Sequence, residues 1–272
     1  MAAVLDAVTG FLAPPPLSPL FQPEGALAFL RNEDVGFMLI AMSCFFVLDF
    51  LIVQKVFVPK ARYFALHVVC NAVSAYFSFP DVRRAVTEDP WTAFTGASCG
   101  MVANSTVAAL HIYHCLAFKL SGADIFHHAV FVTILCGLAI PYKHTGGVAN
   151  NFGCFFLSGL PGGMDYVLLV LMQHGLIDKI TEKKWNAVIN VWLRGPSMSI
   201  YLFLGWMTWW FHSEKLTFPP ILLFLVVALH FFNGQYYARM AVETYTVHVE
   251  RGNTGVAGPA AEGTGSRSRK DQ

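Results

Sequence analysis

The stretch YFALHVVCNAVSAYFSFP, residues 63–80, contains no Asp, Glu, Lys or Arg and is bounded by Arg62 and Asp81. A helix that crosses a bilayer needs about 20 mostly apolar residues, because lipid offers no hydrogen-bond partner to backbone N–H and C=O groups. This stretch is close to that length. Uncharged intervals of similar size recur along the chain, so their positions predict the fold.

These intervals predict seven membrane-spanning helices. The expected helices lie near residues 35–57, 61–79, 98–119, 124–142, 150–173, 186–211 and 218–240. The first of them is interrupted only by Asp49 and Lys55. The predicted fold is therefore all-α, a polytopic membrane helical bundle with about seven transmembrane helices.

The composition of the 272-residue chain agrees with a lipid environment. Charged residues make up 13% of the chain and apolar residues 55%, whereas a soluble domain has about 25% charged residues. The 18 Lys and Arg nearly balance the 17 Asp and Glu, and the net charge is +1. Because nucleic-acid binding requires a basic surface, nucleic acid is not an expected partner.

The sequence predicts three regions. They are an extramembrane lead over residues 1–34, a transmembrane domain over residues 35–245 and a disordered tail over residues 246–272. The end of the chain is rich in Gly, Ala, Ser and Thr and has too few large apolar side chains to fold. Most Lys and Arg residues fall in predicted loops on the side of the C-terminus. This bias places the C-terminus in the cytosol.

Ionisable side chains inside the predicted spans are the candidates for a functional site. Such groups are costly in lipid, so they normally face the interior of a bundle and mark a site or an ion pair. On the predicted topology they form a layer in the cytosolic half. The members of this layer are Asp49, His67, His111, His114, His127, His128, Asp165, Arg194, His230 and Asn233.

Helical spacing groups these polar residues further, because residues three, four or seven apart share a helix face. The predicted stripes include one of His67, Asn71, Ser74 and Ser78 and one of Ser158, Gly162 and Asp165. Asp124 precedes His127 and His128 by three and four positions. Its carboxylate is therefore expected to hold an imidazole in one tautomer.

The candidates are divided by expected role. Those expected in catalysis are His127, His128, Asp124, His111, His114 and Asp165. Those expected in substrate binding are His67, Asn71, Arg194, Ser158, His230 and Asn233. No metal-ligand set is predicted. No cofactor is predicted either, apart from acyl-CoA as a co-substrate if the chain transfers acyl groups.

Four segments, RYFALHVVCN, HIYHCLAFKLSGADIFHH, FFLSGLPGGMDYVLL and HFFNGQYY, follow one another in this order. Together they resemble the TLC-domain family, which includes the ceramide synthases, the translocation-associated membrane proteins and other lipid-linked proteins. The resemblance covers residues 35–245. It implies a TLC-like bundle around an acyl-chain cavity in the endoplasmic reticulum or another endomembrane, with His127 and His128 matching the family's paired histidines. Asp165 follows them later than in the synthases, which points to the non-synthase branch.

Two functions follow from the pattern and the resemblance. In the favoured one, the protein handles lipid without chemistry, by binding acyl chains in lipid homeostasis or trafficking. The alternative is a ceramide-synthase-type acyltransferase that uses acyl-CoA. In that mechanism His128 would take a proton from a lipid amine or hydroxyl, and Arg194 or His114 would stabilise the oxyanion. The resemblance would place a further Asp and a Glu in the synthase site, but no Asp or Glu follows Asp165 until Asp178, and this favours the first function.

Two other classes are weighed against these. A metal oxygenase would use the HxxH at residues 111–114 and the HH at residues 127–128, but the sequence has no further histidine box after the fifth span. A heptahelical receptor would carry its ligand-binding groups in the outer half, whereas the ionisable residues favour the inner half. Membrane lipids are the expected partners, and the sequence leaves open whether the chain forms a homo-oligomer.

Overall fold

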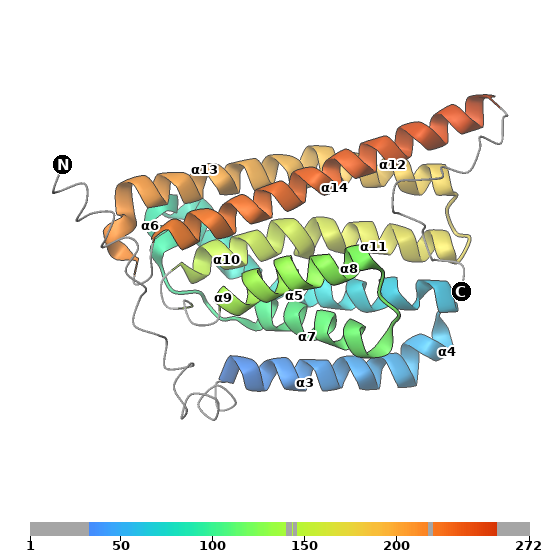
Figure 1. The fold of residues 1–272 in the computed structure, drawn as a ribbon, viewed down its shortest axis with the longest axis horizontal. Helices are drawn as coiled ribbons and strands as arrows, with labels where there is room; N and C mark the ends of the chain where they lie inside the picture. Colours follow the sequence, from blue (N-terminus) through green and yellow to red (C-terminus); the bar gives the residue numbers. More distant parts are fainter. Residues whose placement is uncertain (1–32, 140–142, 144–145, 217–219, 255–272) are drawn as a thin grey trace.

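The computed structural model describes residues 33–139, 143, 146–216 and 220–254 (Figure 1). All regular elements within these ranges are helices, which confirms the predicted all-α class. The helices run along a common axis, with α3 at one edge of the molecule and α13 and α14 at the opposite edge (Figure 1). Most of the predicted lead and tail lies outside the described residues.

The helical elements often follow one another without a break, with short π-helical or 3-10 segments (η) between α-helices. The first half of the chain forms α3 (Glu33–Leu48), η2 (Asp49–Val53), α4 (Gln54–Val56), η3 (Pro59–Ala61), α5 (Arg62–Thr87), α6 (Pro90–Thr95), α7 (Val102–Ala117), α8 (Gly122–His127), η4 (His128–Cys136) and α9 (Gly137–Ala139). The second half forms α10 (Gly147–Cys154), η5 (Phe155–Gly159), α11 (Leu160–Gln173), α12 (Lys179–Ile189), η6 (Asn190–Arg194), α13 (Gly195–His212), η7 (Ser213–Lys215) and α14 (Pro220–Thr254).

Three helical runs in the described part of the chain are long and apolar enough to cross a membrane. They are Glu33–Val56, Gly147–Gln173 and Ile221–Gly252. The surface of the molecule also exposes many large apolar side chains, among them Ile40 of α3, Phe50 of η2 and Trp192 of η6. Apolar surface on this scale is typical of a protein solvated by lipid. The chain is therefore an integral, multi-pass membrane protein.

The other predicted spans are also helical, but they do not meet this criterion of length and composition. α7 has 16 residues. α5 is long enough at 26 residues, but it carries buried polar side chains along much of its length. The polar side chains that identify the predicted site thus also lower the mean hydropathy of the helix that carries them.

α5 packs between α7 and the run from α10 to α11, and its contacts fix an antiparallel register with both. On the α7 side, the Tyr63 and His114 rings stack at a centroid distance of 4.4 Å. At the far end of α5, the buried Asp81 carboxylate accepts hydrogen bonds from the Cys99 N–H at 2.9 Å and from Asn151 Nδ2 at 2.7 Å. Asp81 therefore ties α5 to the loop before α7 and to α10.

α14 continues beyond the predicted end of the transmembrane domain. The sequence places this end at residue 245, whereas the helix extends to Thr254. Its last part, YTVHVER (residues 245–251), alternates polar and apolar residues, and Thr244 and Thr246 hydrogen-bond to backbone carbonyls within the helix. The glycine-rich sequence that favours disorder begins later than the predicted boundary.

Candidate functional site

The structure brings together five histidines from α5, α7 and the junction of α8 and η4. This histidine cluster consists of His67, His111, His114, His127 and His128. The closest ring centroids are 4.6 Å apart for His67 and His114 and 4.7 Å apart for His111 and His128. His127 lies 5.7 Å from His111 by the same measure. The predicted meeting of the paired histidines with those of the second and third spans is therefore present.

The position of the paired histidines depends on how α8 begins. Ser121 is the N-cap, and its side chain and that of Asp124 form a reciprocal capping box. Asp124 Oδ2 accepts hydrogen bonds from the Ser121 N–H at 3.0 Å and from the Ser121 hydroxyl at 2.7 Å. This arrangement satisfies backbone donors at the start of the helix and sets the rotation that turns His128 inward.

The expected role of the Asp124 carboxylate is corrected by this geometry. The atom of Asp124 that meets His128 is its backbone carbonyl oxygen, which lies 2.5 Å from His128 Nδ1. The carboxylate is engaged in the capping box, because a Ser three positions earlier gives it a nearer donor. Asp124 thus orients the imidazole as predicted, but through its main chain.

Hydrogen bonds to backbone carbonyls fix the tautomer of three members of the cluster. The Nδ1 atoms of His67, His111 and His128 lie 2.9, 2.7 and 2.5 Å from the carbonyl oxygens four residues earlier in their own helices. A carbonyl oxygen only accepts, so Nδ1 of each ring carries the hydrogen. In the neutral ring Nε2 is then a bare acceptor. The cluster therefore presents several lone pairs and favours a partner that donates hydrogen bonds.

Two members of the cluster have buried nitrogen atoms without a protein partner. Within the described part of the chain, Nδ1 and Nε2 of His114 and Nε2 of His128 make no hydrogen bond. His114 is completely buried and His128 is 8% exposed. Buried polar atoms are nearly always hydrogen-bonded, so orphaned ones are typical of a site that is completed by a ligand or by water. No group of three or more His, Cys, Asp or Glu among the described residues has the arrangement of a metal site.

Tyrosine rings, which were not among the predicted site residues, line the cluster. Tyr166 of α11 stacks on His67 with a centroid distance of 4.1 Å, and Tyr63 stacks on His114 at 4.4 Å. Tyr237 of α14 lies 6.3 Å from His127. These rings give the site a partly apolar wall. Tyr63 could have been found from its spacing, because it precedes His67 by four residues.

Asp165 and Arg194 form a buried ion pair next to the cluster. Arg194 Nη2 lies 2.9 Å from Asp165 Oδ2, and Arg194 Nε donates to the Leu157 carbonyl at 3.0 Å. Asn190 joins the pair, because its Nδ2 donates to Asp165 at 3.1 Å and its Oδ1 accepts from Arg194 Nη1. The positive charge of Arg194 is thus compensated within the protein, and the pair ties η5, α11 and η6 together.

Asn71 links the histidine cluster to the ion pair. It is buried on α5 one turn after His67 and lies against Gly162 of α11. A Cβ added at Gly162 would lie 3.0 Å from Asn71 Nδ2 and 3.6 Å from Arg194 Nη2. The lack of a side chain at Gly162 therefore allows α5 and η6 to approach α11 at this point.

We expect Gly162→Ala to disturb the site and Gly163→Ala to leave it unchanged. The added methyl at position 162 would press on Asn71 Nδ2 at 3.0 Å, whereas at position 163 the nearest atom lies 3.5 Å away. An alanine without steric conflict stabilises a helix by about 0.5–1 kcal/mol relative to glycine. Thermal unfolding of the purified protein should therefore show a lower Tm for Gly162→Ala than for Gly163→Ala. Equal Tm values would contradict the close packing of Asn71.

Three predicted members of the site have other partners. Asp49 pairs with Arg62 and accepts from the Tyr113 hydroxyl at 2.6 Å, so it holds η2 against α5 and α7. Ser158 donates to the Cys154 carbonyl of its own helix at 3.0 Å.

Of the two α14 candidates, His230 is separate from the cluster by its contacts. His230 packs edge-on against Tyr201 at 5.4 Å, and its Nδ1 lies 2.8 Å from the Val226 carbonyl. It also lies against Gly153, so it belongs to the packing of α10, α13 and α14. Asn233 is buried on the same helix. Helix assignment alone could not place His230, because Tyr237, seven residues later on the same face of α14, is the residue that reaches the level of the cluster.

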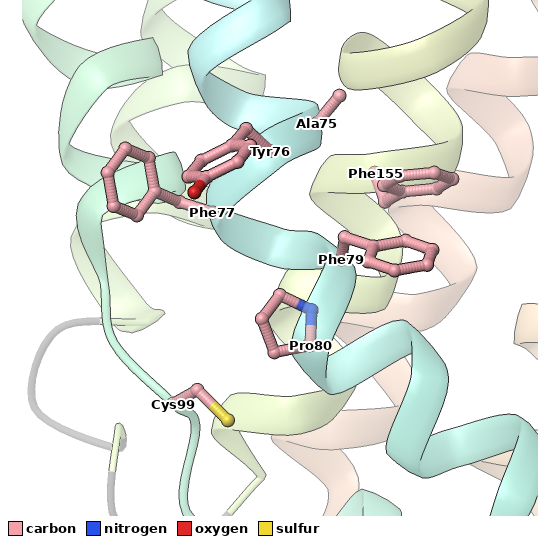
Figure 2. A pocket seen from close by; sticks show the side chains of 7 residues that line it. All are labelled: Ala75, Tyr76, Phe77, Phe79, Pro80, Cys99 and Phe155. Atoms are coloured by element: carbon pink, nitrogen blue, oxygen red, sulfur yellow. The ribbon is translucent and has the colours of Figure 1, made fainter.

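An apolar groove lies on α5, beginning one turn after Asn71. Its lining residues are Ala75, Tyr76, Phe77, Phe79, Pro80, Cys99 and Phe155 (Figure 2). The groove has a volume of about 640 Å³. The Phe79 and Phe155 rings form one side, with centroids 6.1 Å apart, and Tyr76 and Phe77 lie on the other (Figure 2). The histidine cluster and this groove thus share one helix.

Comparison of the chain with protein-family models, with curated protein sequences and with solved structures finds no match.

Proposed function

We propose that the protein is a lipid-handling membrane protein. The polar headgroup of a membrane lipid binds at the histidine cluster, and its acyl chain follows α5 into the apolar groove. The protein thereby serves lipid homeostasis or trafficking in the endoplasmic reticulum or another endomembrane. The resemblance to the non-synthase branch of the TLC-domain family agrees with this proposal.

The observation that carries the proposal is the meeting of five histidines, of which His67, His114 and His128 are buried and two of these have nitrogen atoms without a partner in the described residues. Bare imidazole nitrogens accept hydrogen bonds, so a hydroxyl or amine headgroup is the fitting ligand. The groove begins at Ala75, which is eight positions after His67 and thus about 12 Å along the helix. A single lipid acyl chain can span that distance.

The proposed arrangement in the membrane has seven spanning helices, the N-terminus outside or in the lumen, and the C-terminus in the cytosol. Helical runs occupy all seven predicted intervals within the described residues. With this arrangement the histidine cluster lies in the cytosolic half, because it combines the start of α5, the end of α7 and the start of α8.

A second candidate function is acyl transfer from acyl-CoA to a lipid amine or hydroxyl. The observation that favours it is the buried Nε2 of His128, which has no partner in the described residues and could take a proton from such an acceptor. Two observations weaken it. The Asp165 carboxylate is paired with Arg194, which leaves that guanidinium engaged rather than free to stabilise an oxyanion. The Asp124 carboxylate caps α8.

Photolabelling with a diacylglycerol that carries a diazirine in its acyl chain tests the proposal. We expect peptides from residues 75–80 and from Phe155 to be labelled in membranes that contain the wild-type protein, because these residues line the groove. His127→Ala/His128→Ala should lose this labelling, since the headgroup contacts disappear. Labelling confined to lipid-facing helices such as α3, or unchanged in the double variant, would contradict the proposal.

The same preparations distinguish binding from acyl transfer. Purified wild-type protein is incubated with labelled acyl-CoA and the diacylglycerol, and the lipid products are separated. Groove labelling without an acylated product supports lipid handling. A product that the double variant no longer forms would instead establish the acyltransferase.

A further inference from the structure

α5 carries buried polar side chains along one face for most of its length. This polar seam consists of His67, Asn71, Ser74, Ser78 and Asp81, each no more than 4% exposed. Their spacing of three and four residues places them on one face of the helix. From His67 to Asp81 the seam extends about 21 Å, compared with about 30 Å for the hydrocarbon core of a bilayer.

α7, which packs against α5, carries a second set of buried polar groups at the level of the middle of the seam. The two helices are antiparallel, and their register is fixed by Tyr63 against His114, by the Cys70 thiol 3.7 Å from the Thr106 carbonyl, and by the bond from Cys99 to Asp81. By this register Ser74 lies at the level of Asn104. The buried α7 residues at this level are Asn104, Ser105 and Thr106.

The buried polar side chains of the seam, of α7 and of Asn151 leave several oxygen atoms without a hydrogen bond within the part of the chain that the structure describes. The atoms that lack a hydrogen-bond partner in the described residues are Ser74 Oγ, Asn104 Oδ1, Ser105 Oγ, Thr106 Oγ1 and Asn151 Oδ1. Polar residues that only hold membrane helices together bond directly across the interface. Buried polar atoms without a protein partner are normally bonded to internal water.

Other atoms of the same residues hold the framework in place. Asn104 Nδ2 donates to the Cys136 carbonyl at 3.1 Å, and Asn151 Nδ2 donates to Asp81. Ser78 donates to the Ser74 carbonyl at 2.5 Å. The backbone is thus fixed while hydrogen-bonding capacity remains along the seam.

Titratable groups lie at both ends of the polar seam. At one end are the imidazoles of the histidine cluster, of which His127 is only partly buried. At the other end is Asp81, which lies 3.5 Å from Nη1 of Arg84 and beside the exposed Cys99. Arg84 is itself partly exposed and donates to the Ala97 carbonyl at 2.9 Å. Imidazole and carboxyl groups are the side chains that commonly relay protons within membranes.

We propose that the polar seam is a hydrated path that conducts protons between the two membrane faces. A proton exchanges between water and Asp81 at one end, moves along hydrogen-bonded water past Ser78, Ser74 and Asn71, and reaches the histidine cluster at the other end. Each step breaks one O–H or N–H bond as the next forms, and no other reactant is consumed. The path rests on the proposed seven-helix arrangement but not on lipid binding.

Proton flux into vesicles tests this path. The full-length protein is reconstituted into phosphatidylcholine vesicles that contain a pH-sensitive dye, and a potassium gradient with valinomycin provides the driving potential. Wild-type protein should change the internal pH faster than protein-free vesicles. Ser74→Leu should reduce the rate to the protein-free level, because an apolar side chain fills the middle of the seam. Ser74→Ala should retain flux, because it leaves room for water.

Ser43→Leu is the matched control. Ser43 is exposed on α3 and bonds to the carbonyl four residues earlier at 2.9 Å, so its substitution alters a lipid-facing helix only. It should retain wild-type flux. If Ser74→Leu fails to fold, the wild-type measurement still decides, because wild-type flux equal to that of empty vesicles overturns the path. Equal flux for Ser74→Leu and wild type also overturns it. Neither result affects the photolabelling test of lipid binding.

Discussion

Replacing Arg194 with methionine is expected to lower the free energy of unfolding by about 3–5 kcal/mol, because the change leaves a buried carboxylate without its partner. Asp165 is 7% exposed, and its Oδ2 is held by Arg194 at 2.9 Å. Methionine fills most of the volume of the arginine stem, so the loss comes mainly from the charge. Chemical unfolding of the purified protein in detergent measures this effect.

The exposed pair of Arg239 and Glu243 supplies the control. Both side chains are more than half exposed, and the residues lie four positions apart on α14. Arg239 Nε lies 2.7 Å from Glu243 Oε1. A pair of this kind contributes only about 0.3–0.5 kcal/mol, so Arg239→Met should have little effect. The double variant Asp165→Asn/Arg194→Met should recover part of the lost stability, since it removes the unpaired charge. A small loss in Arg194→Met, similar to that of Arg239→Met, would show that the ion pair is not buried in the folded protein.

Replacing His114 with leucine should stabilise the lipid-free protein. Both ring nitrogens of His114 are fully buried without a partner in the described residues. An unsatisfied buried polar group costs about 1–3 kcal/mol, whereas the lost stacking on Tyr63 and His67 is worth about 0.5–1.5 kcal/mol. The first effect outweighs the second, so we expect a higher Tm for His114→Leu in delipidated protein. A site kept for function is expected to show such a conflict with stability.

A lower Tm for His114→Leu than for wild type would contradict this expectation. It would mean that His114 serves the packing of α5 against α7, as His230 serves the packing of α14 against Tyr201. His230→Leu is therefore the reference variant. Its Nδ1 already bonds to the Val226 carbonyl at 2.8 Å, so no gain in Tm is expected there.

The helices and the meeting of the histidines could be predicted from the sequence because both depend on local patterns. Uncharged intervals place the helices, and antiparallel neighbours bring the start of α5, the end of α7 and the start of α8 to the same level. His67, His111 and His128 therefore meet although they are far apart in the chain. The level of a side chain along its helix is less predictable, and this is where His230 was misplaced, because Tyr237, seven residues later on the same face, is the α14 residue that reaches the cluster.

The hydrogen-bond partners of the acidic residues could not be predicted from spacing, because several donors lie within reach of each carboxylate. Asp49 was expected in the site, but Arg62 and Tyr113 lie nearer to it. The Asp124 carboxylate was expected at an imidazole, but Ser121 at the N-cap offers closer donors. That capping box is readable in the sequence as Ser followed by Asp three residues later. The π-helical segments η2, η4 and η6 were not predicted, because the uncharged intervals and the helical spacing do not distinguish a π-helix from an α-helix.

Lipid retention by His114→Leu tests most directly whether the histidine cluster is a lipid site. Native mass spectrometry is applied to wild type and variant after the same mild detergent purification, with Ser43→Leu as the lipid-facing control. We expect wild type and Ser43→Leu to retain a lipid with a hydroxyl or amine headgroup and His114→Leu to release it, although His114→Leu is the more stable protein. The same lipid bound at the same occupancy in His114→Leu would show that the histidines do not hold the headgroup.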